Sequence, residues 1–449
     1  MALLTAMLQG CTALPKPSDA PLPQIATALE GPGGAVPARK RAAILASLDG
    51  DGPGSDLLEK HLAYEQAIAG SPLVIGNRLT LLQNGPQTYE AMFTAIGRAR
   101  HHINLETYIF ENDEIGQQFA QRLLERQAAG VQVNLIYDSV GALATPRAFF
   151  DELRKAGIQI VEFNPVNPLA DNAKTWKINN RDHRKLLVVD GSVAFVGGIN
   201  ISSVYSSSPS GSSGSASGDG WRDTHIRIEG PAVAEFQKLF IETWKRQDGK
   251  PFSLPESAYF PALEEKGDEI VRAIGSSPRE ANSPIYLTLL SAIAHAEKEI
   301  LLTIAYFAPD PQLLDALTDA ADRGVAVRLI FPSKSDSWQI FHLGRSYYAK
   351  LLRGGVQIYE RQGAVMHAKT ACIDGVWSTV GSTNLDWRSF LHNDEVNAIV
   401  ISRDFARELR AVFAEDLDHS TEITRADWRR RSLGQRIQER LARIGAYWL

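Results

Sequence analysis

The spacing of apolar residues in the first half of the chain predicts alternating strands and helices. Runs that alternate with a period of two, such as Ile103 to Phe110 (INLETYIF), indicate strands, and runs with apolar residues every three to four positions indicate helices. Gly130 and Gly157 fit the ends of two of these helices. We expect strands at 103–110, 131–137 and 158–163 and helices at 86–100, 114–129 and 146–156.

The second half of the chain repeats this order. It predicts strands at 300–307, 325–331 and 356–359 and helices at 310–323 and 340–353. Strands that alternate with helices pack as layered α/β structures. We therefore predict the α/β class, with two similar α/β/α sandwich domains that have mixed sheets and are related by a pseudo-two-fold axis. The active site is expected in the cleft between them.

Composition along the chain indicates where the segments begin and end. Residues 12–37 are rich in Pro, Ala and Gly, which is typical of a disordered linker, and 206–219 form a run rich in Ser and Gly. That run is either a simple insertion or a mobile loop beside the cleft. We predict a disordered tail or lipoprotein signal at 1–37, a helical segment at 38–70, two domains at 71–255 and 256–420, and a basic amphipathic helix at 421–449.

The C-terminal segment combines arginines with apolar residues at helical spacing. Such a helix suits an anionic membrane surface, but its apolar face could equally pack on the second domain, and the two interpretations are compatible. The arginines are Arg425, Arg429, Arg430, Arg431, Arg436, Arg440 and Arg443, and the apolar residues are Leu433, Ile437, Leu441, Ile444 and Trp448.

Composition also limits the class of protein. A chain of 449 residues has room for two domains of ordinary size. Its formal net charge of −5 argues against a basic nucleic-acid binder. No run approaches the roughly 18–20 apolar residues of a transmembrane helix, so we expect none.

The two cysteines bear on membrane attachment. Cys372 is expected to be a buried apolar residue, and Cys11 follows an apolar run in a Leu-x-Gly-Cys sequence that resembles a lipoprotein cleavage box. No Lys or Arg precedes that run, so Cys11 is either acylated or a chance cysteine in a tail.

One motif occurs twice, and each position of the second copy lies 184 residues after its counterpart (367 against 183, for example). A register shared by seven positions predicts two equivalent half-sites that face each other. The copies comprise His183, Lys185, Asp190, Gly191, Gly197 and Asn200 in the first, His367, Lys369, Asp374, Gly375, Gly381 and Asn384 in the second, and the residues between His and Lys.

These residue types suit cleavage of a phosphodiester. A histidine can attack phosphorus, and a second histidine can carry the proton of the leaving oxygen. Lysines and asparagines can bind the phosphate oxygens, and small residues let the backbone approach them. Because the motif brings lysines and no compact carboxylate cluster, we predict catalysis without a metal or other cofactor.

The doubled HxKxxxxD motif, followed by GGxN or GSxN, resembles the phospholipase D superfamily, and the flanking sequence resembles bacterial cardiolipin synthases over residues 72–449. The segments that carry this resemblance are 106–110 (ETYIF), 181–185 (RDHRK), 197–200 (GGIN) and the arginine-rich C-terminus.

The resemblance implies a role for each matched residue. His183 corresponds to the nucleophile and His367 to the general acid and base, although the order could be reversed. Lys185, Lys369, Asn200 and Asn384 would bind phosphate, whereas Asp190 and Asp374, which we count with the catalytic set, are mostly structural in the family. A carboxylate downstream of each motif would orient its histidine. Asp223 and Glu395 fit that position, with Asp394 as the rival of Glu395.

The function predicted on this basis is a cardiolipin synthase-like phosphatidyltransferase that converts phosphatidylglycerol to cardiolipin and glycerol through a phosphohistidine. The alternatives are a phospholipase D that yields phosphatidic acid, a nuclease or other phosphodiesterase of the superfamily, and an inactive lipid-binding protein. We expect a monomer that binds anionic phospholipid membranes and not nucleic acid. It would be peripheral or anchored through Cys11 in a bacterium, because the two membrane spans frequent in the family are missing here.

Overall fold

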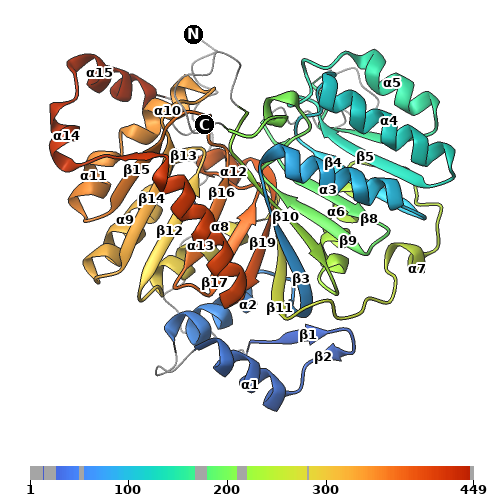
Figure 1. Cartoon of the computed structure of the whole chain (residues 1–449), viewed down its shortest axis with the longest axis horizontal. Helices are drawn as coiled ribbons and strands as arrows, with labels where there is room; N and C mark the ends of the chain where they lie inside the picture. Colours follow the sequence, from blue (N-terminus) through green and yellow to red (C-terminus); the bar gives the residue numbers. More distant parts are fainter. Residues whose placement is uncertain are drawn as a thin grey trace, which may run out of the picture.

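A computed structural model describes residue 14 and residues 27–49, 55–166, 179–209, 220–280 and 283–444. It shows two α/β halves side by side, the first coloured blue to green and the second yellow to red (Figure 1). The predicted class is confirmed. Cys11, Trp448 and the greater part of the run 206–219 lie outside the described residues.

The first half is built on a mixed sheet. Parallel strands β4, β5 and β6 form one side of it, and β8, β9, β10 and β3 continue it with antiparallel pairing. The strands are β3 (Leu73–Gln83), β4 (His102–Thr107), β5 (Gln132–Asp138), β6 (Gln159–Phe163), β7 (Arg181–Asp182), β8 (Lys185–Val189), β9 (Val193–Gly197) and β10 (Thr224–Glu229). The helices are α3 (Asn84–Arg98), α4 (Glu114–Ala128), α5 (Arg147–Lys155), α6 (Val233–Arg246), α7 (Glu256–Tyr259) and the short 3₁₀ turn Ser203–Tyr205.

The second half has the same strand order. Strands β12, β14 and β15 are parallel, and β16, β17, β19 and β11 follow with antiparallel pairing. The strands are β11 (Glu269–Ser276), β12 (Glu299–Ile304), β13 (Phe307–Ala308), β14 (Ala326–Pro332), β15 (Gln357–Arg361), β16 (Lys369–Ile373), β17 (Trp377–Gly381), β18 (Leu385–Asp386), β19 (Asn393–Ile401) and β20 (Ser420–Glu422). The helices are α8 (Pro284–Ala294), α9 (Pro311–Asp322), α10 (Trp338–Arg345), α11 (Tyr348–Arg353), α12 (Trp387–Leu391), α13 (Arg403–Asp418), α14 (Arg425–Arg430) and α15 (Leu433–Ala442).

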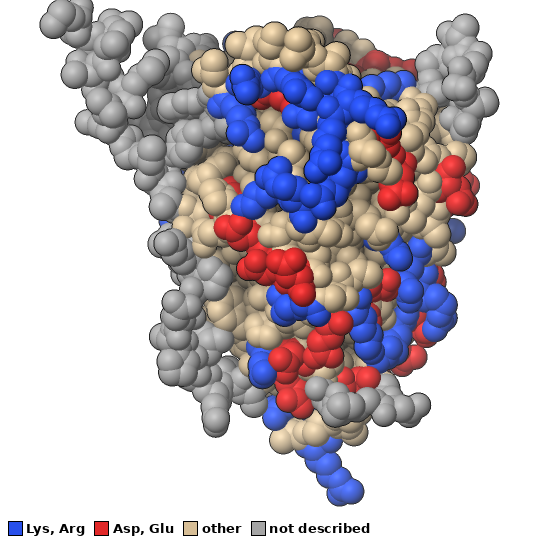
Figure 2. Space-filling model, turned by 90° about the vertical axis from the view of Figure 1, so that its left-hand side faces the viewer, with Lys and Arg blue, Asp and Glu red and all other residues tan. Residues whose placement is uncertain are grey.

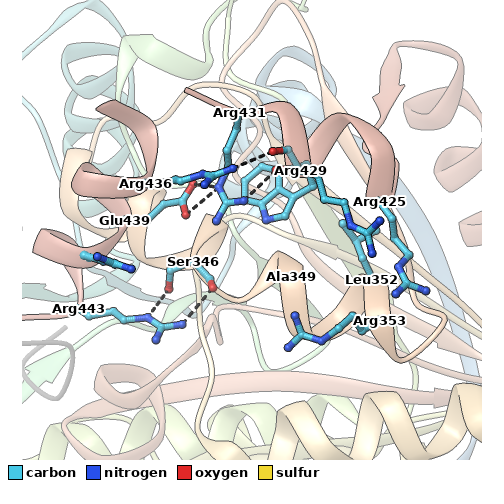
Figure 3. Close-up of a pocket in the computed structure, with 12 residues that line it drawn as sticks. Ser346, Ala349, Leu352, Arg353, Arg425, Arg429, Arg431, Arg436, Glu439 and Arg443 are labelled. Atoms are coloured by element: carbon cyan, nitrogen blue, oxygen red, sulfur yellow. Dashed lines mark hydrogen bonds and ion pairs between the residues drawn. The ribbon is translucent and has the colours of Figure 1, made fainter. Parts of the chain in front are cut away.

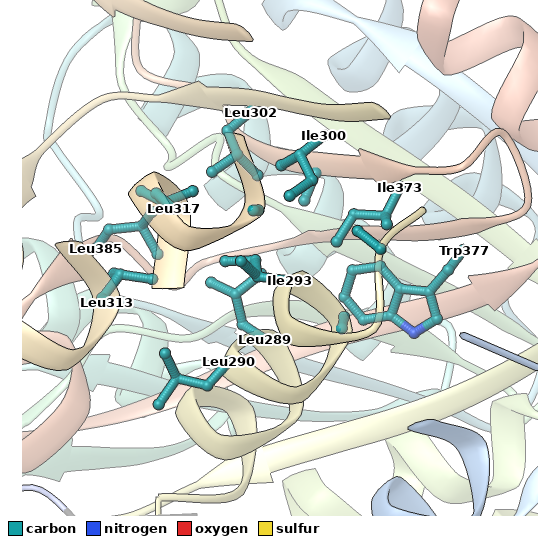
Figure 4. Close-up of a cluster of buried hydrophobic side chains, with 14 of the residues drawn as sticks. Leu289, Leu290, Ile293, Ile300, Leu302, Leu313, Leu317, Ile373, Trp377 and Leu385 are labelled. Carbon is teal, nitrogen blue, oxygen red and sulfur yellow. The ribbon is translucent and has the colours of Figure 1, made fainter. Parts of the chain in front are cut away.

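The two halves share a core. Helix α6 of the first half and α13 of the second bury aromatic and aliphatic residues together with side chains from both sheets, such as Val196 and Val380. The outer face of the second sheet buries α8 and α9, where Leu289, Leu317 and Trp377 pack together (Figure 4). Strands β3 and β11 pair antiparallel, so the two sheets are continuous. Burial of apolar surface on both sides of this junction stabilises one arrangement of the halves.

Three predicted segments differ from the structure. The helix expected at 340–353 is two helices, because the hydroxyl of Ser346 donates to the carbonyl of Leu343 (2.7 Å) and ends α10. The C-terminal helix is also two, since Ser432 forms a capping box with Gln435 and begins α15 anew. Part of the expected linker is ordered: β1 (Leu29–Gly31) pairs with β2 (Gly34–Ala35) and with β3.

The helical segment expected at 38–70 comprises α1 (Ala38–Asp49) and a π-helical turn, Leu57–His61, that continues into α2 (Leu62–Ile68). It is tied to the second half by Glu65, which is fully buried. The carboxylate of Glu65 pairs with Arg272 Nε (2.7 Å) and accepts a hydrogen bond from Trp377 Nε1 (3.2 Å). The positive charge of Arg272 helps keep the pKa of this carboxyl below its usual value against the effect of burial.

This buried pair leads to a prediction about stability. Glu65→Ala leaves the Arg272 guanidinium buried without its counterion, and we expect the free energy of unfolding to fall by about 3 kcal/mol. Urea denaturation followed by circular dichroism measures it. Glu59→Ala, at an exposed position of the same segment, is the matched control. Equal stability of the two variants would contradict a structural role for Glu65.

Candidate active site

The two motif histidines lie at equivalent places in the two sheets. His183 lies two residues before Lys185, the first residue of β8, and His367 lies two residues before Lys369, the first residue of β16. Both histidines line one cavity of about 370 Å³ whose walls come from both halves. The doubled motif therefore forms a single site.

The carboxylate that contacts His183 comes from the other half. Glu395 on β19 lies 3.0 Å (Oε1) and 3.1 Å (Oε2) from His183 Nδ1. Strand β19 reaches across because it pairs in parallel with β7, where the N–H of His183 donates to the carbonyl of Asp394 (2.9 Å). Asp394 itself forms an ion pair with Arg246 (3.0 Å), so the structure favours Glu395 over its rival.

His367 is likewise contacted by a carboxylate from the opposite half. Asp223 Oδ2 of the first half lies 2.8 Å from His367 Nδ1. The N–H of His367 donates to the carbonyl of Arg222 (2.7 Å), where the two halves meet in a short parallel bridge. The expectation that each carboxylate orients the histidine of its own motif is thus wrong. The pairs are crossed because the chain after each motif lies beside the other motif.

Contact at Nδ1 fixes how each imidazole can act. A carboxylate that accepts the Nδ1 proton leaves the Nε2 atom of a neutral histidine with a free lone pair. The burial of His183 and the charges of Lys185 and Lys369 hold its pKa well below the usual value. Burial lowers the pKa of His367 as well, whereas the hydrogen bond and negative charge of Asp223 favour its protonated form.

The two motif lysines lie side by side with the histidines in the buried part of the site. Lys185 Nζ donates to the carbonyl of His183 (2.6 Å), and Lys369 Nζ donates to that of His367. Burial lowers the pKa of Lys185 to about 7 and that of Lys369 to about 8. Burial likewise raises the pKa of Glu395 to about 7. A phosphodiester anion in the cavity would favour the charged lysines again.

The two asparagines line the cavity but have different partners. Asn200 Oδ1 accepts from the N–H of Ile109 (3.2 Å), and its Nδ2 lies 3.3 Å from the hydroxyl of Tyr205. Asn384 is buried, and its Oδ1 has no hydrogen-bond partner in the part of the chain that the structure describes. Its amide is therefore able to turn toward a ligand.

The motif aspartates do not line the cavity. Asp190 accepts hydrogen bonds from the N–H groups of Arg100, His101 and His102 (2.8, 2.8 and 2.9 Å), and Asp374 does the same for residues 297–299 at the same distances. Both aspartates have positive φ, 50° and 52°, and each is followed by a glycine with positive φ. They fix the turn after the motif strand, so their place in the catalytic set is corrected to a structural one.

Comparison with known proteins identifies the family. A family model described as cardiolipin synthase, PLD-like domain, matches residues 92–208 and 289–417, which is more than half of the chain. The chain belongs to the cardiolipin synthase family. A cardiolipin synthase of Geobacillus thermodenitrificans is 37% identical over 386 residues, which cover 86% of this chain and 74% of the relative. Cardiolipin synthase 2 of Bacillus cereus is 36% identical, covering 81% and 69%.

Among solved structures, phosphatidylserine synthase from Haemophilus influenzae matches with a TM-score of 0.64 at 13% identity, covering 85% of this chain and 96% of that one. At this identity the match supports the fold alone. As a member of the cardiolipin synthase family, the protein is an enzyme of the phosphatidyltransferase type. Within the described residues, no helix is long and apolar enough to cross a membrane.

Several cavity residues of this family member were not singled out from the sequence. The hydroxyl of Tyr205 lies 3.1 Å from His367 Nδ1, and the ring of Trp221 lies 5.3 Å from that of His367. Tyr108 and Tyr306 end equivalent strand regions and pack edge-on against His183 and His367, with ring centroids at 5.1 and 5.8 Å. Their matching positions in the two halves were the available signal in the sequence.

The clustered basic groups lead to a prediction about pH. In the free enzyme, burial and mutual repulsion lower the pKa values of both lysines and of His367, and a bound phosphodiester anion would raise them. Activity that needs these groups protonated is lost as pH rises through those pKa values. The alkaline limb of kcat, which reports the complex, should therefore lie about one pH unit or more above that of kcat/KM. Coincident limbs in steady-state profiles with a dispersed short-chain substrate would contradict it.

Proposed function

We propose that this enzyme converts two molecules of phosphatidylglycerol to cardiolipin and glycerol through a phosphatidyl-histidine intermediate. The observation that carries the proposal is that the histidines and asparagines of both motifs line one cavity, with each motif lysine bonded to the carbonyl of its histidine and each histidine contacted by a carboxylate of the opposite half. The relatives named cardiolipin synthase support the choice of substrate.

The first step is attack of His183 Nε2 on phosphorus. His183 suits this role because its lowered pKa keeps it neutral and nucleophilic. A P–N bond forms while the bond between phosphorus and the oxygen of the head-group glycerol breaks. That oxygen takes a proton from His367, and glycerol leaves. The charge of Asp223 stabilises His367 in the protonated form that this transfer requires.

The second step reverses the proton transfer. His367, now neutral, removes the proton of the acceptor hydroxyl as that oxygen attacks phosphorus, and the P–N bond breaks. Lys185, Lys369, Asn200 and Asn384 would bind the non-bridging oxygens in both steps, where negative charge grows in the transition state. No metal is needed in this scheme, because the lysines supply the positive charge.

Product analysis tests the reaction. Phosphatidylglycerol liposomes with EDTA should yield cardiolipin and glycerol in equal amounts from the wild type. Phosphatidic acid without cardiolipin would make water the acceptor and the enzyme a phospholipase D. No turnover on any phospholipid, together with cleavage of DNA or RNA, would support a nuclease instead.

We also propose that the enzyme works as a monomer at the surface of an anionic membrane. One chain contains both half-sites, so catalysis requires no second copy. Attachment is peripheral or through a lipid on Cys11. Mass spectrometry of the protein from its native membrane would distinguish the two, since acylation adds the mass of the lipid to the N-terminal peptide.

A further inference from the structure

A cluster of arginine side chains lies away from the catalytic cavity, on and beside helices α11, α14 and α15. Figure 2 shows the corresponding band of basic residues on the face that carries α14 and α15. These helices enclose a groove of about 610 Å³. Six of the arginines that line it are Arg353, Arg425, Arg429, Arg436, Arg440 and Arg443.

Almost none of this charge is neutralised. The acidic side chain in the groove is Glu439, and it pairs with a seventh arginine, Arg431 (3.0 Å). Within the described residues, the other six make no ion pair with a carboxylate, although Arg443 donates to Ser346 (3.0 Å) (Figure 3). A local excess of six positive charges in a chain of net charge −5 indicates a binding surface for anions.

The apolar face of α15 is exposed beside this groove. Leu433, Ile437 and Leu441 are 74, 56 and 53% exposed, at spacings that place them on one side of the helix, and Ile444, two residues after its end, is 72% exposed. The opposite side packs inward, where Ala442 and Glu439 are buried. The interpretation that the apolar face packs on the second domain is therefore wrong for these four residues. A helix with exposed leucines and isoleucines next to arginines fits the interface of a lipid bilayer.

Other exposed apolar residues lie near the catalytic cavity. Trp338, 51% exposed, begins α10, and the next turns of that helix contribute Ile340 to the cavity wall and contact α15. Leu143 is 71% exposed and follows Gly141, which packs against Tyr108. Val204, 41% exposed, precedes Tyr205 of the cavity wall. Exposed apolar residues thus lie close in sequence to residues that line or contact the cavity wall in both halves.

We propose that the arginine groove and the exposed face of α15 form a docking surface for an anionic phospholipid bilayer. The arginines bind lipid phosphate groups, and the apolar residues enter the acyl boundary. Because α10 connects this surface to the cavity wall, docking turns the mouth of the cavity toward the lipid. The orientation of the cavity mouth toward the lipid rests on the proposed phospholipid substrate, whereas the binding of this surface to the membrane does not.

Vesicle flotation tests the docking surface without any need for turnover. The wild type should bind vesicles of phosphatidylglycerol and phosphatidylcholine, bind pure phosphatidylcholine weakly, and lose affinity as salt rises. The triple variant Arg425→Gln/Arg429→Gln/Arg440→Gln should bind the anionic vesicles about 100-fold more weakly, since each arginine near such a surface contributes a several-fold factor. Ile437→Ser/Leu441→Ser should also weaken binding.

The matched charge control is Arg39→Gln/Lys40→Gln/Arg98→Gln. It removes the same charge from exposed positions on α1 and α3, outside the groove, and should bind like the wild type. Unchanged thermal unfolding and unchanged turnover of detergent-dispersed substrate would show that the groove variants keep their fold and active site.

Two results would overturn the proposal. The first is equal loss of vesicle binding in the groove variant and the charge control. The second is a wild-type dimer that Ile437→Ser/Leu441→Ser converts to a monomer with vesicle binding intact, because a second copy would then cover α15. If only the groove variant loses vesicle binding, and the wild type makes no cardiolipin, the proposed reaction would be refuted and the docking surface would be supported.

Discussion

His183→Ala and His367→Ala should each lower kcat/KM for phosphatidylglycerol by about 10⁵-fold. One variant lacks the atom that forms the bond to phosphorus, and the other lacks the group that moves the proton in both steps. Cardiolipin formation in liposomes measures both losses. His101→Ala is the control, since His101 is exposed and outside the cavity, and it should retain wild-type activity.

A substrate with an activated leaving group separates the two roles. Phosphatidyl-4-nitrophenol releases a stable phenolate that needs no proton, so His367→Ala should still form the covalent intermediate and release about one equivalent of nitrophenol in a burst. His183→Ala should give no burst. A burst from His183→Ala alone would reverse the assignment. Absence of a burst and of a mass increase on His183 in every variant would contradict covalent catalysis.

The sequence predicted the architecture well because the doubled register constrains it strongly. Two copies of a motif at one offset require two equivalent sheets, and the turn residues Asp190-Gly191 and Asp374-Gly375 have the same left-handed conformation in both. The strand order after β4 and β12 then repeats. Local patterns of this kind report strands, helices and turns reliably, because they depend on neighbouring residues.

What the sequence could not show depends on contacts between distant segments. The pairing of β7 with β19 joins residues more than 200 positions apart, and the spacing of apolar residues along the chain does not indicate it. For the same reason the crossed carboxylates were assigned to the wrong histidines. The break in the C-terminal helix had a readable signal, Ser432 followed by Gln435 three residues later, whereas the exposure of Leu433 and Ile437 depends on what the rest of the fold leaves uncovered.

The crossed carboxylates make a second prediction with a large effect. Glu395→Gln should slow the nitrophenol burst by about 10³-fold, because the amide cannot hold His183 in the tautomer that keeps Nε2 free. Asp223→Asn should leave the burst and slow the subsequent steady-state rate by a similar factor, since it weakens His367 as a base. Rapid mixing with phosphatidyl-4-nitrophenol measures both phases.

The design distinguishes the crossed arrangement from one in which each half is independent. If each carboxylate served the histidine of its own motif, Asp223→Asn would abolish the burst and Glu395→Gln would affect only the later phase. Asp394→Asn provides the comparison on the same strand, because the carboxylate of Asp394 pairs with Arg246, whereas its hydrogen bond with His183 is made by the backbone carbonyl and is kept in the variant. Its burst should remain within about tenfold of the wild type. Since each histidine depends on a carboxylate from the opposite half, any change that separates β7 from β19 should disable attack on phosphorus even when both motifs remain intact.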